Sequence, residues 1–575
     1  MHLMEWNDGQ GDSWRDRISQ PVHEMRVTKR LRVPMRDGVH LSVDVFAPDN
    51  DGAYPALVAY APYWNEGQYL PVPTSNPHPT AAMGNYAIEA GDSAYLAARG
   101  YAHVVANVRG TGESEGEYQL MGPLEAQDGY DLIEWLAEQP WCDGNVGMVG
   151  VSYFSWIQYL VAAQQPPHLR AIAPIEGATD FYRDVCYRGG ILSLGFLSYW
   201  NTELSDRESI SRTERDLSPE DFQALTERIR DENLDIRHVY SAYQLLMAPR
   251  KNPVLHDAIM HPLDGPWYHE RSGYQHFDRI DVPVLSGAAL DFWDLHLAGG
   301  FRAWDRMSNP ANKHMIYPRF HLRPFAENHD VLVRWYDHWM KGNDTGMLDE
   351  SPVMLWVQGD DTWRNEHEWP LERTEWKRLY LRADNALSWD EPAPDEGSDS
   401  FDNIPYVYLE SIFGGVPSAV YRTEPLESDL EVSGPIALEL MGSLTDTDGH
   451  WIVEIRDVSP DGSTRIVTKG WLKASFRALN TELSTPFRPE RDYTDPEPVT
   501  PGAIDRYAIQ VHDTSNTFLA GHRLELIVKS LDHSLEGEWN TIFYHLPSSR
   551  DVTHTVHHNA ENPSYLLLPV VPRAL

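Results

Sequence analysis

Short apolar runs alternate with helical stretches between Met25 and Ala178, and this alternation limits the fold more than any other feature of the chain. The runs predict buried strands at 57–62, 102–110, 146–152 and 169–176. Residues 154–165 have helical spacing and are followed by two prolines. Strand, helix and strand in succession predict a parallel α/β sheet with right-handed crossovers.

The pattern changes twice further along the chain. From about Phe181 to Phe277 it is helical and polar. A helix is expected to begin at Ser218, with this serine as its N-cap. The α/β rhythm then resumes, with strands expected in 281–291 and 314–321 and a helix at 331–344. After about Ser351 the apolar residues alternate with a period of two, which predicts an all-β sandwich of jelly-roll type.

Composition excludes several function classes. Acidic residues outnumber basic ones by 86 to 47, a net charge of −39, which disfavours nucleic acid and anionic membranes as partners. No apolar run approaches the roughly 18 residues of a membrane span, and the N-terminal residues have no apolar core typical of a signal peptide. The two cysteines favour reduced thiols and hence a cytoplasmic protein.

The sharpest local motif is Gly150-Val151-Ser152-Tyr153, with a predicted strand before it and a predicted helix after it. A nucleophilic serine of the α/β-hydrolase type needs this strand–turn–helix context. The second glycine usual in that motif is absent, because position 154 is Phe. A serine after a strand is more often a helix cap, so the motif alone leaves both roles open.

Candidate partners for Ser152 follow in the order that α/β-hydrolases use, first an acid and then a histidine. Asp291 follows one predicted strand and His321 follows the next, with Asp294 and His329 as the alternatives. In such a triad the histidine takes the serine proton, and the acid orients the imidazole. The backbone N–H of Tyr153 is the expected first donor to the oxyanion.

Several longer segments together resemble a family of serine hydrolases that contains cocaine esterase, X-prolyl dipeptidyl aminopeptidases and α-amino-acid ester hydrolases. The resemblance covers the chain beyond the first ~25 residues; the segments that carry it are 33–48, 61–63, 107–116, 125–153, 334–342 and 456–463, together with those of Asp291 and His321. It implies Ser152, Asp291 and His321 as the triad and the hydroxyl of Tyr63 as the second oxyanion donor. It implies no cofactor and no metal.

The same resemblance implies an α/β-hydrolase domain with an inserted helical cap and a C-terminal jelly roll. The expected limits are an N-terminal extension at 1–24, a catalytic domain at 25–180 and 278–350, a cap at 181–277 and a β-sandwich at 351–575. A homodimer or higher homo-oligomer is compatible with this architecture.

The expected function is that of a carboxylesterase acting on small to medium acyl substrates. An X-Pro dipeptidyl aminopeptidase or an α-amino-acid ester hydrolase is the first alternative, and it needs carboxylates that bind a free amine. Glu176, Asp180 and Asp184 are candidates for that role. The alternative from another class is a non-catalytic protein that binds its partner through the jelly roll. Two family aromatic positions near Asp291 and His321 are replaced here, which leaves the substrate open.

Overall fold

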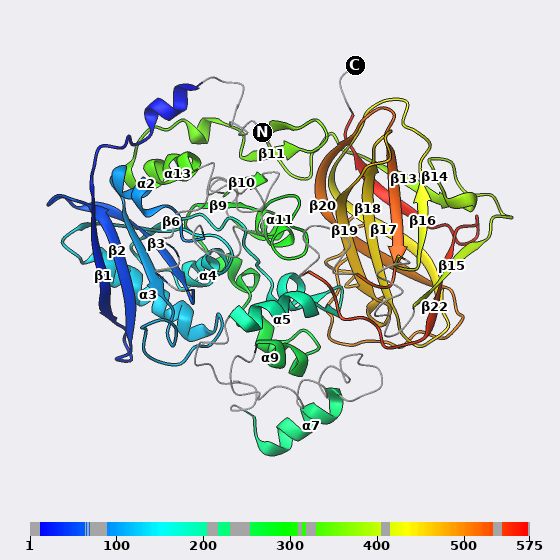
Figure 1. Ribbon diagram of the computed structural model, residues 1–575, viewed down its shortest axis with the longest axis horizontal. Coiled ribbons are helices and arrows are strands. Elements are labelled where there is room, and N and C mark those ends of the chain that lie inside the picture. The colour runs from blue at the N-terminus through cyan, green and yellow to red at the C-terminus, as the bar shows by residue number, and fades with distance from the viewer. Residues whose placement is uncertain are drawn as a thin grey trace.

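The computed structural model describes residues 12–63, 65, 68, 89–203, 217–229, 254–308, 313–317, 329–403, 415–532 and 543–572. Two large β-sheets lie on opposite sides of the molecule (Figure 1). The first is surrounded by helices and contains residues from the first two thirds of the chain, whereas the second is built from the last third.

Among the described residues, the first sheet has ten strands in the order β1-β2-β4-β3-β5-β6-β9-β10-β11-β12. The strands from β4 to β11 in that order are parallel, whereas β1, β2 and β12 pair antiparallel at the edges. Their bounds are Met25–Pro34 (β1), His40–Pro48 (β2), Tyr54–Ala61 (β3), Ala102–Asn107 (β4), Cys142–Met148 (β5), Leu169–Ile172 (β6), Val284–Gly287 (β9), Lys313–Tyr317 (β10), Val353–Val357 (β11) and Thr362–Glu366 (β12). The central strands are almost wholly buried apolar segments, as a parallel sheet covered on both faces requires.

Helices connect and cover these strands. Their bounds are Ser93–Ala98 (α2), Pro123–Ala137 (α3), Tyr153–Ala162 (α4), Leu194–Glu203 (α5), Pro219–Ile229 (α7), Val254–Met260 (α9), Pro266–His269 (α10), Leu297–Arg306 (α11) and His329–Lys341 (α13). The expected start of α7 is confirmed, since the Ser218 hydroxyl accepts the N–H of Asp221 at 3.0 Å.

In the part of the chain that the structure describes, the second sheet system has eleven strands and is nearly all antiparallel. Its strands are Glu375–Arg382 (β13), Ala386–Ser388 (β14), Ser398–Asn403 (β15), Ser418–Arg422 (β16), Leu430–Leu444 (β17), His450–Val458 (β18), Thr464–Lys473 (β19), Asp505–Phe518 (β20), Arg523–Lys529 (β21), Val552–His557 (β22) and Tyr565–Val570 (β23). Strand β23 pairs with both β13 and β17, and side chains between the layers form a separate apolar core. The C-terminal part is therefore a β-sandwich.

Strands β11 and β12 follow residue 351 yet extend the first sheet, because Val353 pairs with Met315 of β10 in parallel register. The sequence pattern placed this stretch with the sandwich. Period-two alternation marks a strand that has one solvated face, but it does not identify the sheet that the strand joins.

A third apolar cluster joins the two parts of the molecule. It contains Ala288, Leu290 and Trp293 from the loop after β9, packed with sandwich residues that include Ile452 and Trp471. The Trp293 indole also donates to the carbonyl of Val467 at 3.2 Å. The loop that carries Asp291 is thus packed against the C-terminal domain.

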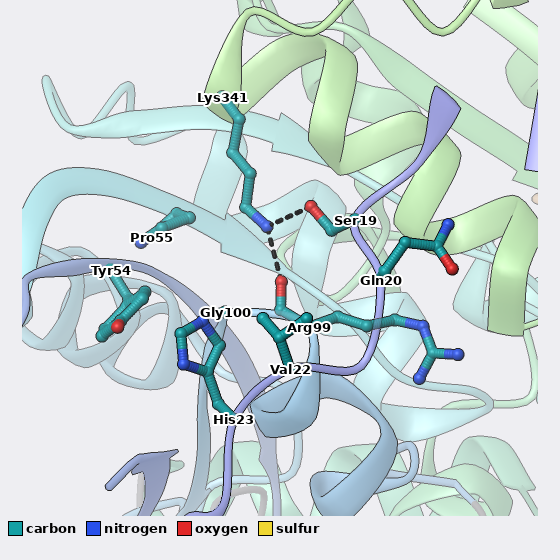
Figure 2. A pocket seen from close by; sticks show the side chains of 9 residues that line it. All are labelled: Ser19, Gln20, Val22, His23, Tyr54, Pro55, Arg99, Gly100 and Lys341. Carbon is teal, nitrogen blue, oxygen red and sulfur yellow. Dashed lines mark hydrogen bonds between the residues drawn. The ribbon is translucent and has the colours of Figure 1, made fainter. Parts of the chain in front are cut away.

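Part of the N-terminal extension is packed on helix α13. Ser19 donates its hydroxyl to Asp337 at 2.7 Å, and the Lys341 ammonium donates to Ser19 Oγ and to the Arg99 carbonyl, both at 2.8 Å (Figure 2). The pocket of about 360 Å³ around these groups is also lined by Tyr54, which begins β3. It therefore lies at the opposite end of the parallel strands from Ser152, and its lysine is already bonded within the protein.

Candidate active site

Ser152 lies on the turn between strand β5 and helix α4, as the sequence predicts. Its φ of 59° and ψ of −123° place a non-glycine residue in a strained backbone region. Three backbone hydrogen bonds fix the turn, from Val149 to Val58, from Val151 to Glu89, and from Ser152 to Glu176 at 3.1 Å. Strain of this kind persists only where the surroundings impose it, and it is typical of functional turns.

Gly150 makes the tight turn possible without a second glycine. Its φ is +133°, and a Cβ on it would lie 2.2 Å from the Cβ of Phe154. Position 154 can therefore be Phe, because position 150 has no side chain.

Tyr153, directly after the serine, is fixed at its hydroxyl. That hydroxyl donates to Glu125 Oε2 at 2.6 Å and accepts the N–H of Met121 at 2.9 Å. Burial raises the pKa of the Glu125 carboxyl to about 7. With its side chain held in this way, Tyr153 keeps its backbone N–H in a fixed position at the start of α4.

Tyr63 lies beside the same turn. Its ring centroid is 6.1 Å from that of Tyr153 and 6.0 Å from that of Phe154. The Tyr63 hydroxyl accepts the indole N–H of Trp200 at 3.2 Å. A phenol oxygen that accepts a hydrogen bond still has its own proton to donate. Nothing in the sequence links Trp200 to Tyr63, since the two residues are 137 positions apart.

The two candidate acids face different surroundings. Asp291 is half-buried just beyond β9. Asp294 is buried, and its charged neighbours are Lys469, His545 and Asp532 of the sandwich together with Arg188. Burial raises the pKa of the Asp294 carboxyl. Most charged neighbours of Asp294 therefore belong to the C-terminal domain. This favours Asp291 as the acid of the triad.

Of the two candidate histidines, His321 lies outside the described residues. The alternative, His329, begins α13 and is nearly buried. Its Nε2 accepts the N–H of Asp92 at 3.1 Å, and burial lowers its pKa to about 4. His329 therefore has the surroundings of a structural histidine, which favours His321 as the base.

The carboxylates considered for amine binding are engaged within the protein. Asp184 accepts Arg302 at 2.6 Å and the N–H groups of Thr179 and Asp180, each at 2.9 Å. Burial opposes ionisation of Asp184, but Arg302 and these donors hold its pKa below the usual value. Asp180 accepts Arg183 at 2.9 Å.

Glu176 is likewise engaged, since its Oε1 accepts the N–H of Ala289 at 2.9 Å. Glu176 and Asp184 are also fully buried. Asp180 and Asp184 are thus each paired with an arginine, whereas Glu176 is bonded to a backbone amide and is closed to solvent.

Within the described parts of the chain, no three His, Cys, Asp or Glu side chains are grouped as a metal site would require. The same parts contain no helix that is both long and apolar enough to cross a membrane. Cys142 and Cys186 are buried free thiols.

Comparison with known proteins identifies the family. Residues 37–323 match the family described as X-Pro dipeptidyl-peptidase (S15 family), and residues 345–567 match the X-Pro dipeptidyl-peptidase C-terminal non-catalytic domain. The cocaine esterase of Rhodococcus sp. strain MB1 Bresler is 26% identical, with 95% of this chain and 99% of that protein aligned. A putative serine esterase of Mycobacterium bovis is 27% identical over 87% of this chain and 90% of that protein.

The fold is also found in solved structures. A CocE/NonD family hydrolase from Staphylococcus aureus superposes with a TM-score of 0.77, covering 95% of this chain and 94% of that one at 22% identity. Both matched segments, catalytic and C-terminal, belong to one family and together span most of the sequence. The chain therefore belongs to the S15 family of serine hydrolases, whose members similar to it are named as esterases and as peptidases.

Proposed function

We propose that the protein is a carboxylesterase that works through an acyl-enzyme. Ser152 is the nucleophile, His321 the base and Asp291 the acid. The strained turn at Ser152 supports its role as nucleophile. The surroundings of Asp294 and His329, the alternative acid and base, favour Asp291 and His321 for those roles. The order of these residues along the chain is that of α/β-hydrolases.

The reaction has two steps. His321 takes the Ser152 proton as the hydroxyl attacks the ester carbonyl, and it then protonates the departing alcohol. Asp291 holds the imidazole in the tautomer that accepts from serine. The Tyr153 N–H and the Tyr63 hydroxyl donate to the oxyanion. Water then attacks the acyl-enzyme by the same route and releases the acid.

One observation favours esters of uncharged acyl groups over aminoacyl substrates: the three candidate carboxylates are engaged within the protein. An α-ammonium group is bound by carboxylates that are not already paired with another cation. Asp180 and Asp184 are each paired with an arginine, and Glu176 accepts an amide N–H. The aromatic rings of Trp156 and Trp200 lie 5.8 Å apart beside the turn, which suits an apolar acyl group.

The architecture around this site extends the proposal. We assign α5, α7 and α9 to a cap inserted at 181–277 in a catalytic domain at 25–180 and 278–350, which strands β11 and β12 extend, with a jelly roll in the remainder of 351–575. Trp200 of α5 reaches Tyr63, which supports a cap that closes over the turn. The buried free thiols support a cytoplasmic location.

The test compares substrates on one enzyme. The purified protein is assayed with p-nitrophenyl butyrate, p-nitrophenyl benzoate, an aminoacyl ester and Ala-Pro-p-nitroanilide, with Ser152→Ala as the control. We expect kcat/KM to be higher for the butyrate or the benzoate than for both amine-bearing substrates, and all activity to be lost in Ser152→Ala. A higher kcat/KM for Ala-Pro-p-nitroanilide or for the aminoacyl ester would refute the ester assignment.

A further inference from the structure

Glu176 lies between the nucleophile turn and the acid loop, and it contacts both. We propose that Glu176 is a positioning residue that holds Ser152 and Asp291 in register. This inference rests on the proposed function, because it takes Ser152 and Asp291 as members of the triad.

The backbone of Glu176 makes the first part of the connection. Its carbonyl accepts the N–H of Ser152 at 3.1 Å, and its own N–H donates to the carbonyl of Gly287 at 2.8 Å. The preceding residue, Ile175, forms a parallel bridge to Gly287, the last residue of β9. The backbone of one residue thus joins the serine turn to the end of the strand from which the acid loop leaves.

The side chain makes the second part. Oε1 accepts the N–H of Ala289 at 2.9 Å, and Ala289 lies two residues before Asp291. Oε2 lies 3.3 Å from Nδ1 of His296, which follows Asp291 in the same loop. The carboxylate therefore contacts the acid loop on both sides of Asp291.

The backbone conformation indicates that this arrangement is imposed by the surroundings. Glu176 has a φ of 57°, in the left-handed region, and Ser152 has a φ of 59°. A non-glycine residue with a φ in this range is strained, and it persists only where the surrounding structure holds it. Two such residues are joined here by one hydrogen bond, so the contacts of Glu176 stabilise the strained turn as well as the loop.

The site is closed to substrate. Glu176 and His296 are 0% and 1% exposed. The His296 ring lies against Trp156 of α4, at 5.9 Å between centroids, and against Phe292, at 4.8 Å. Glu176 therefore acts through the residues that it holds, without touching the substrate.

The test uses Glu176→Ala, Glu176→Gln and a matched control, Glu134→Gln. Glu134 accepts the backbone N–H of His168 at 3.1 Å and lies 2.7 Å from its Nδ1, but at the opposite end of β6. We expect Glu176→Ala to lower kcat for p-nitrophenyl butyrate by about 10²-fold, with KM changed by less than about threefold, because displacement of reacting groups by about 1 Å has this effect. Glu176→Gln, whose amide oxygen can accept from Ala289, should restore kcat to within about fivefold of the wild type, and Glu134→Gln should leave it unchanged.

The measurements distinguish a failure of the positioning role of Glu176 from a failure of the proposed esterase activity. Retention of wild-type kcat by folded Glu176→Ala, or an effect on KM alone, would overturn the positioning role. Amide hydrogen exchange of peptides 149–155 and 286–292 gives a readout that needs no activity. We expect exchange to be faster in both peptides of Glu176→Ala than in Glu134→Gln, even if the wild type hydrolyses no ester and the proposed function fails. Unchanged exchange in both peptides would overturn the role of Glu176 by itself. If Glu176→Ala does not fold, Glu176→Asp, one methylene short of the Ala289 amide, takes its place in both measurements.

Discussion

The hydrogen bond from Trp200 to Tyr63 allows a direct test of the oxyanion donor. Replacing Trp200 by Phe removes the indole N–H that the Tyr63 hydroxyl accepts at 3.2 Å, but keeps an aromatic ring beside Tyr153 and Trp156. A neutral hydrogen bond of this kind contributes about 0.5–1.5 kcal/mol. If it orients the hydroxyl toward the oxyanion, its loss should lower kcat between about twofold and about tenfold.

The assay is a double-mutant cycle on p-nitrophenyl butyrate hydrolysis with Trp200→Phe, Tyr63→Phe and the combined variant. Tyr63→Phe removes the proposed oxyanion donor and should lower kcat by about 10²–10³-fold. In that background Trp200→Phe should have almost no further effect, because the hydroxyl that it orients is gone. An equal fold-loss from Trp200→Phe in both backgrounds would show that Trp200 acts without Tyr63. It would refute the role of Trp200 in orienting the Tyr63 hydroxyl.

Three further predictions concern the surroundings of the site and a group of buried charges in the sandwich. Gly150→Ala should destabilise the protein by more than about 1 kcal/mol in urea unfolding, because the new Cβ would lie 2.2 Å from Phe154 in a backbone region that favours glycine; an unchanged midpoint would contradict this. The raised Glu125 pKa, about 7 against 4.5, means that wild-type stability falls as pH rises between these values, so the free energy of unfolding of Glu125→Gln relative to wild type should rise by roughly 3 kcal/mol from pH 4.5 to pH 8. A pH-independent difference would show that the pKa of Glu125 is not raised in the folded protein. Lys529→Met leaves the buried Glu454 and Asp532 without a cation that lies 3.1 Å and 3.9 Å from them and should cost about 3–5 kcal/mol in denaturant unfolding. A loss under about 1 kcal/mol would mean that their other partners compensate them, namely Lys469 for both, Arg456 for Glu454 and His545 for Asp532.

The features that the sequence predicted are local. The strand, turn and helix around Ser152 are encoded in consecutive residues. The same is true of the N-cap residue of α7 and of the alternating strands of the sandwich. Each depends on period, turn chemistry or capping, which are properties of neighbouring residues. The structure has these elements where the pattern placed them.

The features that the sequence missed depend on contacts between distant segments. Trp200 meets Tyr63 across 137 positions, and Glu176 meets Ala289 across 113. The carboxylate of Glu176 was an amine-binding candidate because a sequence shows the charge and not its partners. The assignment of β11 and β12 to the first sheet was missed for the same reason, since pairing with β10 is a tertiary contact.

The proposed function requires Ser152 to be an activated nucleophile. The most direct measurement is labelling of the purified protein with a fluorophosphonate, followed by peptide mapping, with Ser152→Ala and His321→Ala beside it. We predict one label on Ser152, lost in Ser152→Ala and strongly slowed in His321→Ala, because the hydroxyl reacts only when a base removes its proton. A folded wild-type protein that takes no label, or takes it on another residue, would show that Ser152 is not the nucleophile.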